Sequence, residues 1–473
     1  MKILKLLLII IFIIHLCHNV LAQENDSLIS KARFYIKNGE PVLAIPILKK
    51  YSSQFPEEFL PFELIGDCYL EANSFGEAII SYLKALKINP DLTRLSYKLG
   101  NAYDIIEKPD SAIHYFRNFL YSDPNSVAGN LRLAILYLDL PGSGNDSCLS
   151  YAKRALKLDP ENNRAQNILA MSYFSMGNYE QARKTALDGL MKDSNDVNLL
   201  QTVGLCSFYL KEYKNAIDYF DRGIKIIPEN TLLRDYKAQS LLMHNTDPGK
   251  IFYNAEGRVK FYRIQSRYIN EIEKESLQIS GSLSYKSLLG RFRENPAELG
   301  LDEYFMLYYG YSNQPEYSPY NTVDETFNKM LDVNLKKSAE IAEKLVVEYP
   351  VDFPLYLALA GIYKQLGEYN KYNENILRYF GFLEAVKATG EGTSPSSAWI
   401  ITYTSHEKEL VFNLRYTIQS QKYISENGHN FDIISCKDSE GKEVSIYFNI
   451  DRPYMSLMRS MPGKKGISGR KGK

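Results

Sequence analysis

Residues 62–90 read FELIGDCYLEANSFGEAIISYLKALKINP, and their pattern returns 34 residues later. Prolines stand at positions 56, 90 and 124. Three further pairs keep this spacing: Gly66 and Gly100, Tyr69 and Tyr103, and Ala78 and Ala112. Small residues at the eighth and twentieth positions allow two helices to approach closely, and proline begins the turn into the next unit. The period therefore predicts a pair of antiparallel helices in every 34 residues.

The repeat extends over much of the N-terminal half. It continues as six units over about residues 25–230, and a capping helix is expected near 231–243. These residues resemble the tetratricopeptide repeat, whose helix pairs stack into a solenoid. The resemblance implies an α-solenoid over residues 23–243. Cys68 and Cys206 occupy the same place in the second and sixth units, which are not neighbours, so we expect free buried thiols there.

The first helix of each unit is expected to line the concave face, with its ninth and twelfth positions pointing inward. These positions are polar in the first half of the array and apolar in the second. The candidate partner groove consists of Asn101, Ile135, Leu138, Met171, Phe174, Leu205 and Phe208. A partner peptide or helix could lie there, or the downstream stretch 255–275, predicted to be helical, could fill it. Only Asn101 matches the Lys, Arg and Asn clamp that holds a C-terminal carboxylate in some members of the family.

The second half of the chain begins after the turn-rich break HNTDPGK at residues 244–250. Residues 250–390 are predicted to be helical, with an amphipathic helix over 282–293 and a helix pair over 336–367. Residues 391–452 then alternate apolar and polar side chains. They predict a small antiparallel sheet with strands near 399–404 and 410–415, from 431 onward, and over 443–450.

Four segments of this half are distinctive: LYYGY at 307–311, the turn from Gly392 to Trp399, GHNFD at 428–432 and YFNI at 447–450. Together they resemble an uncharacterised domain of secreted Bacteroidetes proteins that often follows tetratricopeptide repeats. The likeness covers about residues 255–451. It implies a fold and an exported location, and it brings no catalytic residues with it.

Residues 305–320, FMLYYGYSNQPEYSPY, are the most aromatic stretch of the chain. Tyr304, Tyr308 and Tyr311 follow helical spacing, so we expect them in a buried helix. The rest of the stretch contains two prolines and is predicted to be a loop. Tyr317 and Tyr320 in that loop are the candidate aromatic contacts for a ligand.

The N-terminus has the features of a signal peptide over residues 1–22. Lys2 and Lys5 precede an apolar run, and Val20 and Ala22 are the small residues before a cleavage site. We expect an exported protein that is periplasmic, outer-membrane-associated or secreted, with no transmembrane segment after the signal peptide. The chain carries 56 basic and 56 acidic residues, a balance that gives no general attraction to nucleic acid.

The motifs of common enzyme classes are missing from the sequence. No HExxH, GxSxG or P-loop pattern occurs, so no catalytic residue, cofactor or metal ligand is assigned. His406 and His429 are expected in loops of the sheet. Residues 453–473 are predicted to be a flexible basic tail, GKKGISGRKGK at its end, that could make weak contact with a polyanion.

The sequence therefore predicts a mainly α protein, with a repeat solenoid followed by a helical region and a small β-sheet. Its expected role is a non-catalytic scaffold or adaptor that binds a protein or peptide. Two alternatives stay open: an envelope enzyme with a site in the C-terminal domain, and a carbohydrate-binding surface built from tyrosines.

Overall fold

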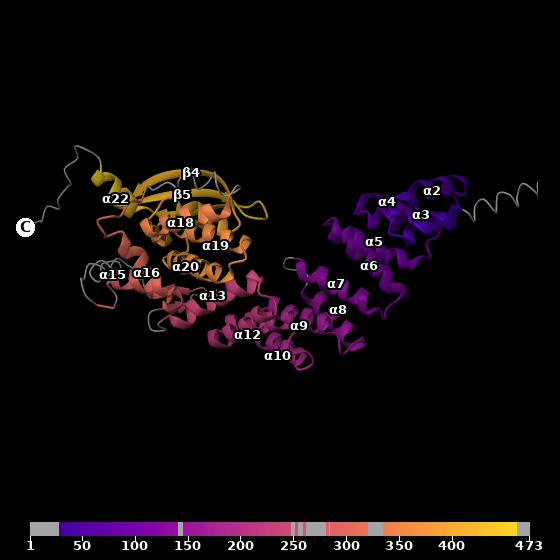
Figure 1. Cartoon of the computed structure of the whole chain (residues 1–473), viewed down its shortest axis with the longest axis horizontal. Coiled ribbons are helices and arrows are strands. Elements are labelled where there is room, and N and C mark those ends of the chain that lie inside the picture. The colour runs from indigo at the N-terminus through magenta and orange to yellow at the C-terminus, as the bar shows by residue number, and fades with distance from the viewer. Residues whose placement is uncertain are drawn as a thin grey trace, which may run out of the picture. The chain divides into compact units, whose positions relative to one another are not determined.

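The computed structural model describes residues 28–140, 145–246, 251–253, 259–261, 281–282, 284–319 and 334–460 (Figure 1). The chain divides into two compact units, Met1–Ser194 and Asn195–Lys473. The predicted fold class, a helical repeat array followed by helices and a small sheet, is confirmed.

The first unit consists of antiparallel helix pairs that follow one another along the chain (Figure 1). In each pair we call the first helix A and the second helix B. The pairs are residues 28–37 with α2 (Pro41–Gln54), α3 (Phe59–Glu71) with α4 (Phe75–Ile88), α5 (Thr93–Ile105) with α6 (Pro109–Ser122), α7 (Val127–Asp139) with α8 (Asn145–Leu158), and α9 (Asn163–Ser175) with α10 (Tyr179–Leu190).

The turn between helices A and B has the same backbone geometry in several pairs. Each such turn holds one residue in the left-handed region, at φ between 56° and 77°. These residues are Gly39, Asn73, Glu107 and Gly177 in the first unit and Lys211 and Gly367 in the second. In the second pair, the N–H of Asn73 donates to the carbonyl of Leu70 and the N–H of Ser74 donates to the carbonyl of Tyr69. These hydrogen bonds satisfy carbonyls at the end of helix A. The 34-residue repeat therefore repeats the helix cap as well as the packing contacts.

Close contact between helices A and B depends on the residue at the eighth position. A Cβ atom on Gly204 would lie 2.4 Å from the ring of Phe220, and one on Gly100 would lie 2.8 Å from the ring of Phe116. In the fifth pair both corresponding positions are alanine, Ala170 and Ala186. Glycine at the eighth position of helix A therefore faces a large residue on helix B, whereas alanine at this position faces a small one.

The second unit begins with the sixth helix pair, α11 (Val197–Tyr209) and α12 (Tyr213–Ile226), followed by α13 (Thr231–Asn245). The C-terminal helices are α15 (Tyr285–Glu294), η1 (Pro296–Glu298), α16 (Leu301–Tyr311), α18 (Leu335–Glu348), α19 (Phe353–Gln365) and α20 (Tyr369–Lys387). Helix α13 caps the sixth pair and also packs on α20. The Arg234 side chain donates to Asn373 Oδ1 at 2.8 Å, and the Tyr372 hydroxyl donates to Asp235 at 2.5 Å. The sixth pair is thus continuous with the C-terminal helices.

Helix α16 is the centre of the C-terminal core. Every residue of this helix except Glu303 is buried, which confirms the predicted buried aromatic helix. A Cβ atom on Gly381 of α20 would lie 2.3 Å from the Tyr304 ring, so α16 and α20 approach closely at this glycine. Buried residues of the helices and of the sheet, among them Phe382 and Phe448, belong to the same hydrophobic core.

The sheet has the strand order β3 (Trp399–Ile400), β6 (Glu443–Asn449), β5 (His429–Lys437) and β4 (Thr417–Glu426). The β4–β5 and β5–β6 pairs are antiparallel, whereas β3 pairs with β6 in parallel. The sheet is therefore mixed, not wholly antiparallel as predicted. The turn before β3 holds it in place, because the Trp399 indole donates to the Gly390 carbonyl at 3.0 Å and the Tyr447 N–H donates to the Gly392 carbonyl.

Several local predictions were wrong. The expected strand at 410–415 is the helix α21 (His406–Asn413), which begins with His406, and His429 is the first residue of β5, so neither histidine lies in a loop. Strand β4 was not predicted, because its side chains are mostly exposed and it lacks an apolar alternation. The start of the predicted tail is the helix α22 (Asp451–Ser460), and residues 461–473 lie outside the described residues.

The segment that could have filled the groove is only partly described. Residues 259–261 form β2 (Val259–Phe261), which pairs with β1 (Ile251–Tyr253) in an antiparallel hairpin. The predicted helix over 255–275 is wrong at these residues, and the rest of that stretch lies outside the described residues, as do residues 1–22.

Candidate functional site

The charged side chains on the A helices of the second and third pairs bind one another. Arg94 donates from Nε and Nη2 to the carboxylate of Glu63 at 2.9 and 2.6 Å. Lys98 Nζ lies 2.6 Å from Asp67 Oδ1, which also accepts from the Tyr82 hydroxyl at 2.7 Å. Burial raises the pKa of Glu63, but the hydrogen bond and charge of Arg94 and the charge of Lys98 outweigh it, so the pKa lies below its ordinary value. These groups stabilise adjacent repeats.

The candidate groove residues of the first unit remain partly accessible. Asn101, Ile135, Leu138, Met171 and Phe174 are all half-buried. Among the described residues, no group forms a hydrogen bond with the buried Oδ1 atom of Asn101. The half-buried apolar side chains of α7 and α9 form a row that can accept an apolar segment.

The candidate groove residues of the second unit are covered more fully. Leu205 is buried, and the ring of Phe208 packs against the rings of Tyr213 and Tyr236 at 5.7 and 5.8 Å. Because Tyr236 belongs to α13, the capping helix fills this part of the face. The downstream chain therefore supplies part of the cover here, although by a different helix from the one expected.

Among the described tyrosines of the C-terminal domain, those of α16 are buried, whereas the Tyr423 ring is 50% exposed and stacks on Tyr454 at 6.1 Å. Tyr304, Tyr308 and Tyr311 are at most 1% exposed. Tyr317 is half-buried, and its hydroxyl donates to the Thr402 carbonyl at 2.5 Å. The hydroxyl of this candidate is thus used within the fold, and Tyr320, the other candidate, lies outside the described residues.

A buried Tyr–His–Asp chain joins three helices of this domain. The Tyr308 hydroxyl accepts from the Thr402 N–H and lies 2.7 Å from His406 Nδ1, so it donates its proton to that nitrogen. His406 Nε2 then carries the ring proton and faces Asp352 Oδ1 at 3.3 Å. Burial lowers the pKa of His406 despite the carboxylate of Asp352. Tyr308 and His406 are 0% exposed, so this chain resembles a catalytic triad in its residue types but has no access to a substrate.

A second polar cluster joins α21 to the sheet, with Glu407 buried and Gln421 exposed. Gln421 donates from its amide to Glu407 Oε2 at 2.9 Å and to Asp432 Oδ2 at 3.1 Å. Burial, and secondly the negative charge of Asp432, raise the pKa of Glu407 to about 9. Glu407 is therefore a neutral acid at pH 7, and its role is to link the helix to strands β4 and β5.

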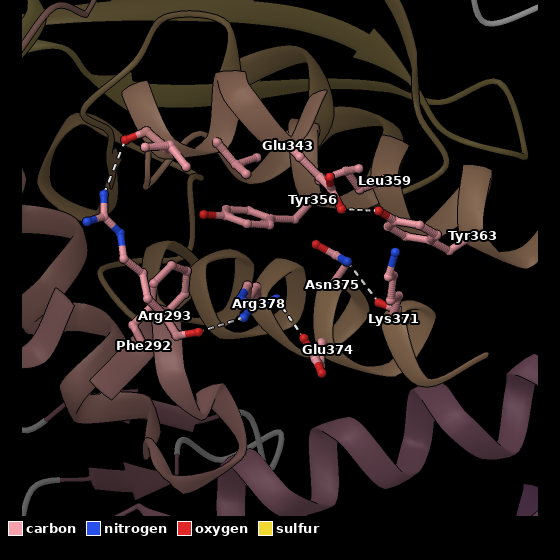
Figure 2. Close-up of a pocket in the computed structure, with 12 residues that line it drawn as sticks. Phe292, Arg293, Glu343, Tyr356, Leu359, Tyr363, Lys371, Glu374, Asn375 and Arg378 are labelled. Atoms are coloured by element: carbon pink, nitrogen blue, oxygen red, sulfur yellow. Dashed lines mark hydrogen bonds and ion pairs between the residues drawn. The ribbon is translucent and has the colours of Figure 1, made fainter. Parts of the chain in front are cut away.

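A cavity of about 380 Å³ lies among α15, α18, α19 and α20 (Figure 2). Its floor contains Phe292, Tyr356, Leu359 and Tyr363, each at most 3% exposed. Charged side chains surround this floor: Arg293 on α15, Glu343 on α18, and Lys371, Glu374 and Arg378 on α20. Figure 2 shows Arg293 at one end of the cavity and Lys371 with Tyr363 at the other.

This cavity was not predicted, although the sequence contains a signal for it. Lys371, Glu374, Asn375 and Arg378 are spaced i, i+3, i+4 and i+7, so a single face of the helix carries four polar residues. The opposing positions lie on separate helices, and no periodicity shows that those helices meet.

The described residues offer no group of three or more His, Cys, Asp or Glu side chains that could hold a metal ion. The thiols of Cys68, Cys148, Cys206 and Cys436 are buried and form no disulfide, as expected for Cys68 and Cys206. Among the helices of the described part, none has both the length and the apolar character needed to span a membrane.

Family comparisons agree with this architecture. Residues 66–104 match the TPR repeat and 93–126 the tetratricopeptide repeat, and residues 145–223 match the family described as anaphase-promoting complex, cyclosome, subunit 3. The chain is a tetratricopeptide repeat protein. Residues 270–459 match the domain of unknown function DUF4919, so the repeats are followed by a C-terminal DUF4919 domain.

Two curated relatives are similar to part of the chain. The TPR repeat-containing protein MJ1428 of Methanocaldococcus jannaschii is 24% identical over 197 residues, which are 41% of this chain and 31% of that protein. DnaJ homolog subfamily C member 7 of Homo sapiens is 23% identical over 197 residues, 41% of this chain and 35% of that protein. The chain thus spans about a third of the length of these relatives.

Two solved structures of tetratricopeptide repeat proteins resemble part of the chain. A tetratricopeptide repeat protein from Parabacteroides merdae has 17% identity and a TM-score of 0.40, covering 50% of this chain and 95% of that one. YrrB, described as a TPR protein with an unusual peptide-binding site, has 20% identity and a TM-score of 0.35, covering 39% of this chain and 95% of its own.

Proposed function

We propose that this protein is a non-catalytic scaffold or adaptor that binds a protein or peptide through the A helices of its repeats. Tetratricopeptide repeat proteins typically bind peptides and proteins. The observation that carries the proposal is the row of half-buried apolar residues on α7 and α9, namely Ile135, Leu138, Met171 and Phe174. Nearby charged residues such as Glu63 and Arg94 bind each other, so the binding contribution of this face is mainly apolar.

The partner is expected to offer an apolar segment. Burial of Ile135, Leu138, Met171 and Phe174 by a partner would remove apolar surface from water, at about 25 cal/mol per Å². An amphipathic helix or an extended apolar peptide meets this requirement.

A non-catalytic role is supported by the placement of the ionisable groups. Tyr308, His406 and Asp352 are buried in the C-terminal core, and none of them lines the cavity among α15, α18, α19 and α20. Their hydrogen bonds connect secondary-structure elements.

We also propose that the protein is exported and works in the periplasm, at the outer membrane or outside the cell. The basic, apolar and small-residue segments of positions 1–22 support this, as does the likeness to domains of secreted Bacteroidetes proteins. Mass spectrometry of the protein purified from its own cells tests it. A mature chain that starts at Gln23 is expected, and a chain that retains residues 1–22 in the cytoplasm would contradict export.

The binding proposal is tested by replacing Phe174 with glutamate. A charge in the apolar row should abolish partner capture from envelope extract while the melting temperature stays unchanged. Tyr121→Glu serves as the control, because Tyr121 is 91% exposed and lies at the end of helix B of the third pair. A Phe174→Glu variant that loses stability in the purified protein would show that the chain itself packs there, and the proposal would then be wrong.

A further inference from the structure

The cavity among α15, α18, α19 and α20 combines an apolar floor with cationic walls. Phe292, Tyr356 and Leu359 provide floor surface that is almost completely buried. Val347 extends the apolar surface at the rim and is 62% exposed. The cavity has a volume of about 380 Å³, which falls within the range of small-ligand pockets, roughly 300–1,000 Å³. The cavity thus has room for one large apolar side chain and a short polar group.

Arg378 is the cation best placed to meet a ligand. Its side chain is 12% exposed, and its guanidinium lies over the Phe292 ring at 5.4 Å from the centroid. Its two polar contacts are long: 3.5 Å to Glu374 and 3.5 Å to the Arg293 carbonyl. A strong charge-assisted hydrogen bond is about 2.7–2.9 Å, so this guanidinium retains much of its capacity to bind an anion.

Arg293 strengthens the positive potential at the same end of the cavity. Its Nη2 atom donates to the Val347 carbonyl at 3.3 Å, and Figure 2 shows Arg293 at the same end of the cavity as Phe292. Burial raises the pKa of Tyr356, while the positive charges of Arg378 and Arg293 oppose this rise. Two guanidinium groups therefore act on the same part of the floor.

The carboxylates of the cavity are already engaged. Glu343 accepts a hydrogen bond from the Tyr363 hydroxyl, at the end of the cavity away from Arg293 (Figure 2). Glu374 is 57% exposed and contacts Arg378. Three cations and two carboxylates line the cavity, and the end formed by Arg293 and Arg378 is the cationic one.

We propose that this cavity binds a carboxylate joined to a large apolar group, with the carboxylate on Arg378 and Arg293 and the apolar group on Phe292, Tyr356 and Leu359. A planar guanidinium suits a carboxylate because it can donate two parallel hydrogen bonds. Two sources share this chemistry: a free apolar carboxylic acid, and the C-terminal residue of a peptide. The cavity does not include the apolar row on α7 and α9, so the test of this proposal is independent of the scaffold proposal.

Calorimetry on the full mature chain tests the proposal with matched probes. N-acetylphenylalanine carries the carboxylate, and N-acetylphenylalaninamide is its neutral counterpart. The acid should bind at least about tenfold more tightly than the amide, a difference of about 1.4 kcal/mol. A blocked tetrapeptide with a C-terminal phenylalanine separates the sources: binding equal to or tighter than the acid supports a peptide terminus, and exclusion supports a small acid.

Variants connect the binding to the cavity. Arg378→Gln should weaken acid binding about tenfold and leave amide binding unchanged, and Arg378→Lys should restore part of it. Arg293→Gln offers a second variant at an exposed position, so a folding defect at Arg378 cannot hide the answer. Lys344→Gln, an exposed cation on α18 outside the cavity lining, is the control. Equal binding of acid and amide, no acid binding up to about 10 mM, or an effect of Lys344→Gln equal to that of Arg293→Gln would overturn the proposal.

Discussion

At the scale of single residues, buried polar side chains hold the C-terminal domain together. Tyr308, His406 and Asp352 form one hydrogen-bonded chain, while Gln421 joins Glu407 to Asp432. An unsatisfied buried polar group costs roughly 1–3 kcal/mol, so each of these groups depends on its partners. Their importance for stability can be measured one side chain at a time.

The substitution Tyr308→Phe removes a hydroxyl that serves two neighbours. His406 Nδ1 would lose its donor and the Thr402 N–H would lose its acceptor, both in the core. We expect the free energy of unfolding in urea to fall by roughly 1–3 kcal/mol. Tyr423→Phe, at a ring that is 50% exposed, should change it by less than about 0.5 kcal/mol. Equal effects of the two substitutions would show that the buried hydroxyl has no special role.

The raised pKa of Glu407 predicts that the stability of the protein depends on pH. Its pKa is raised to about 9 in the fold, against an ordinary value of 4.5. Between these values the unfolded chain releases the proton that the folded chain keeps, so the free energy of unfolding falls as pH rises from about 5 to 9. Glu407→Gln should therefore stabilise the protein at pH 8 by roughly 1–3 kcal/mol and leave it unchanged near pH 4.5.

Urea unfolding at both pH values checks this expectation. Glu440→Gln is the matched control, because Glu440 is exposed in the hairpin turn between β5 and β6. A Glu407→Gln variant that is destabilised at pH 8 would mean that Glu407 is ionised and needed as an anion.

At the scale of helices and strands, the pairing of small and large residues sets the distance between helices A and B. Gly204 faces Phe220 so closely that an added Cβ atom would lie 2.4 Å from the ring. Gly361, which also lies inside a helix, α19, has no neighbour within 4 Å of its added Cβ atom. The two glycines allow packing to be separated from helix propensity.

Gly204→Ala should reduce the free energy of unfolding, because overpacking costs about 1–3 kcal/mol. Gly361→Ala should instead add about 0.5–1 kcal/mol, since alanine favours a helix more than glycine does. In the double variant Gly204→Ala with Phe220→Ala, the loss should be smaller than the sum of the two single losses. Additive losses would show that the glycine and the ring are not coupled.

Some elements of the fold could be predicted from the sequence and others could not, for physical reasons. The helix pairs could be predicted because the same packing demands recur every 34 residues. Strand β4 could not, because its side chains are mostly exposed, and α21 was mistaken for a strand because Leu410, Phe412 and Leu414 alternate over a short segment. The cavity needed knowledge of which helices meet, which a single sequence does not contain.

At the scale of the whole molecule, the C-terminal compact unit begins earlier than the DUF4919 match. The match starts at residue 270, whereas the compact unit starts at Asn195 and includes the sixth helix pair and α13. Arg234 and Asp235 on α13 bind Asn373 and Tyr372 on α20, and Arg234 also lies over the Tyr369 ring at 4.9 Å. The helix that follows the last repeat, α13, therefore packs against the C-terminal domain.

Two fragments test this boundary. Residues 195–473 should unfold cooperatively, whereas 247–473 lacks α13 and should melt several degrees lower or aggregate, because the facing surface of α20 becomes exposed. Circular dichroism with temperature gives the comparison. Identical melting temperatures for the two fragments would show that α13 contributes nothing to the domain.

The most direct test of the scaffold proposal is site-specific photo-crosslinking in living cells. A photoreactive phenylalanine at position 171 places the probe in the half-buried apolar row of α9, and the same residue at position 191 places it at an 80% exposed methionine at the end of α10. We predict a discrete crosslinked partner from position 171 that is absent from position 191 and disappears with Phe174→Glu. Crosslinks that are equal at the two positions, or unaffected by Phe174→Glu, would contradict the proposal that the A-helix face binds the partner.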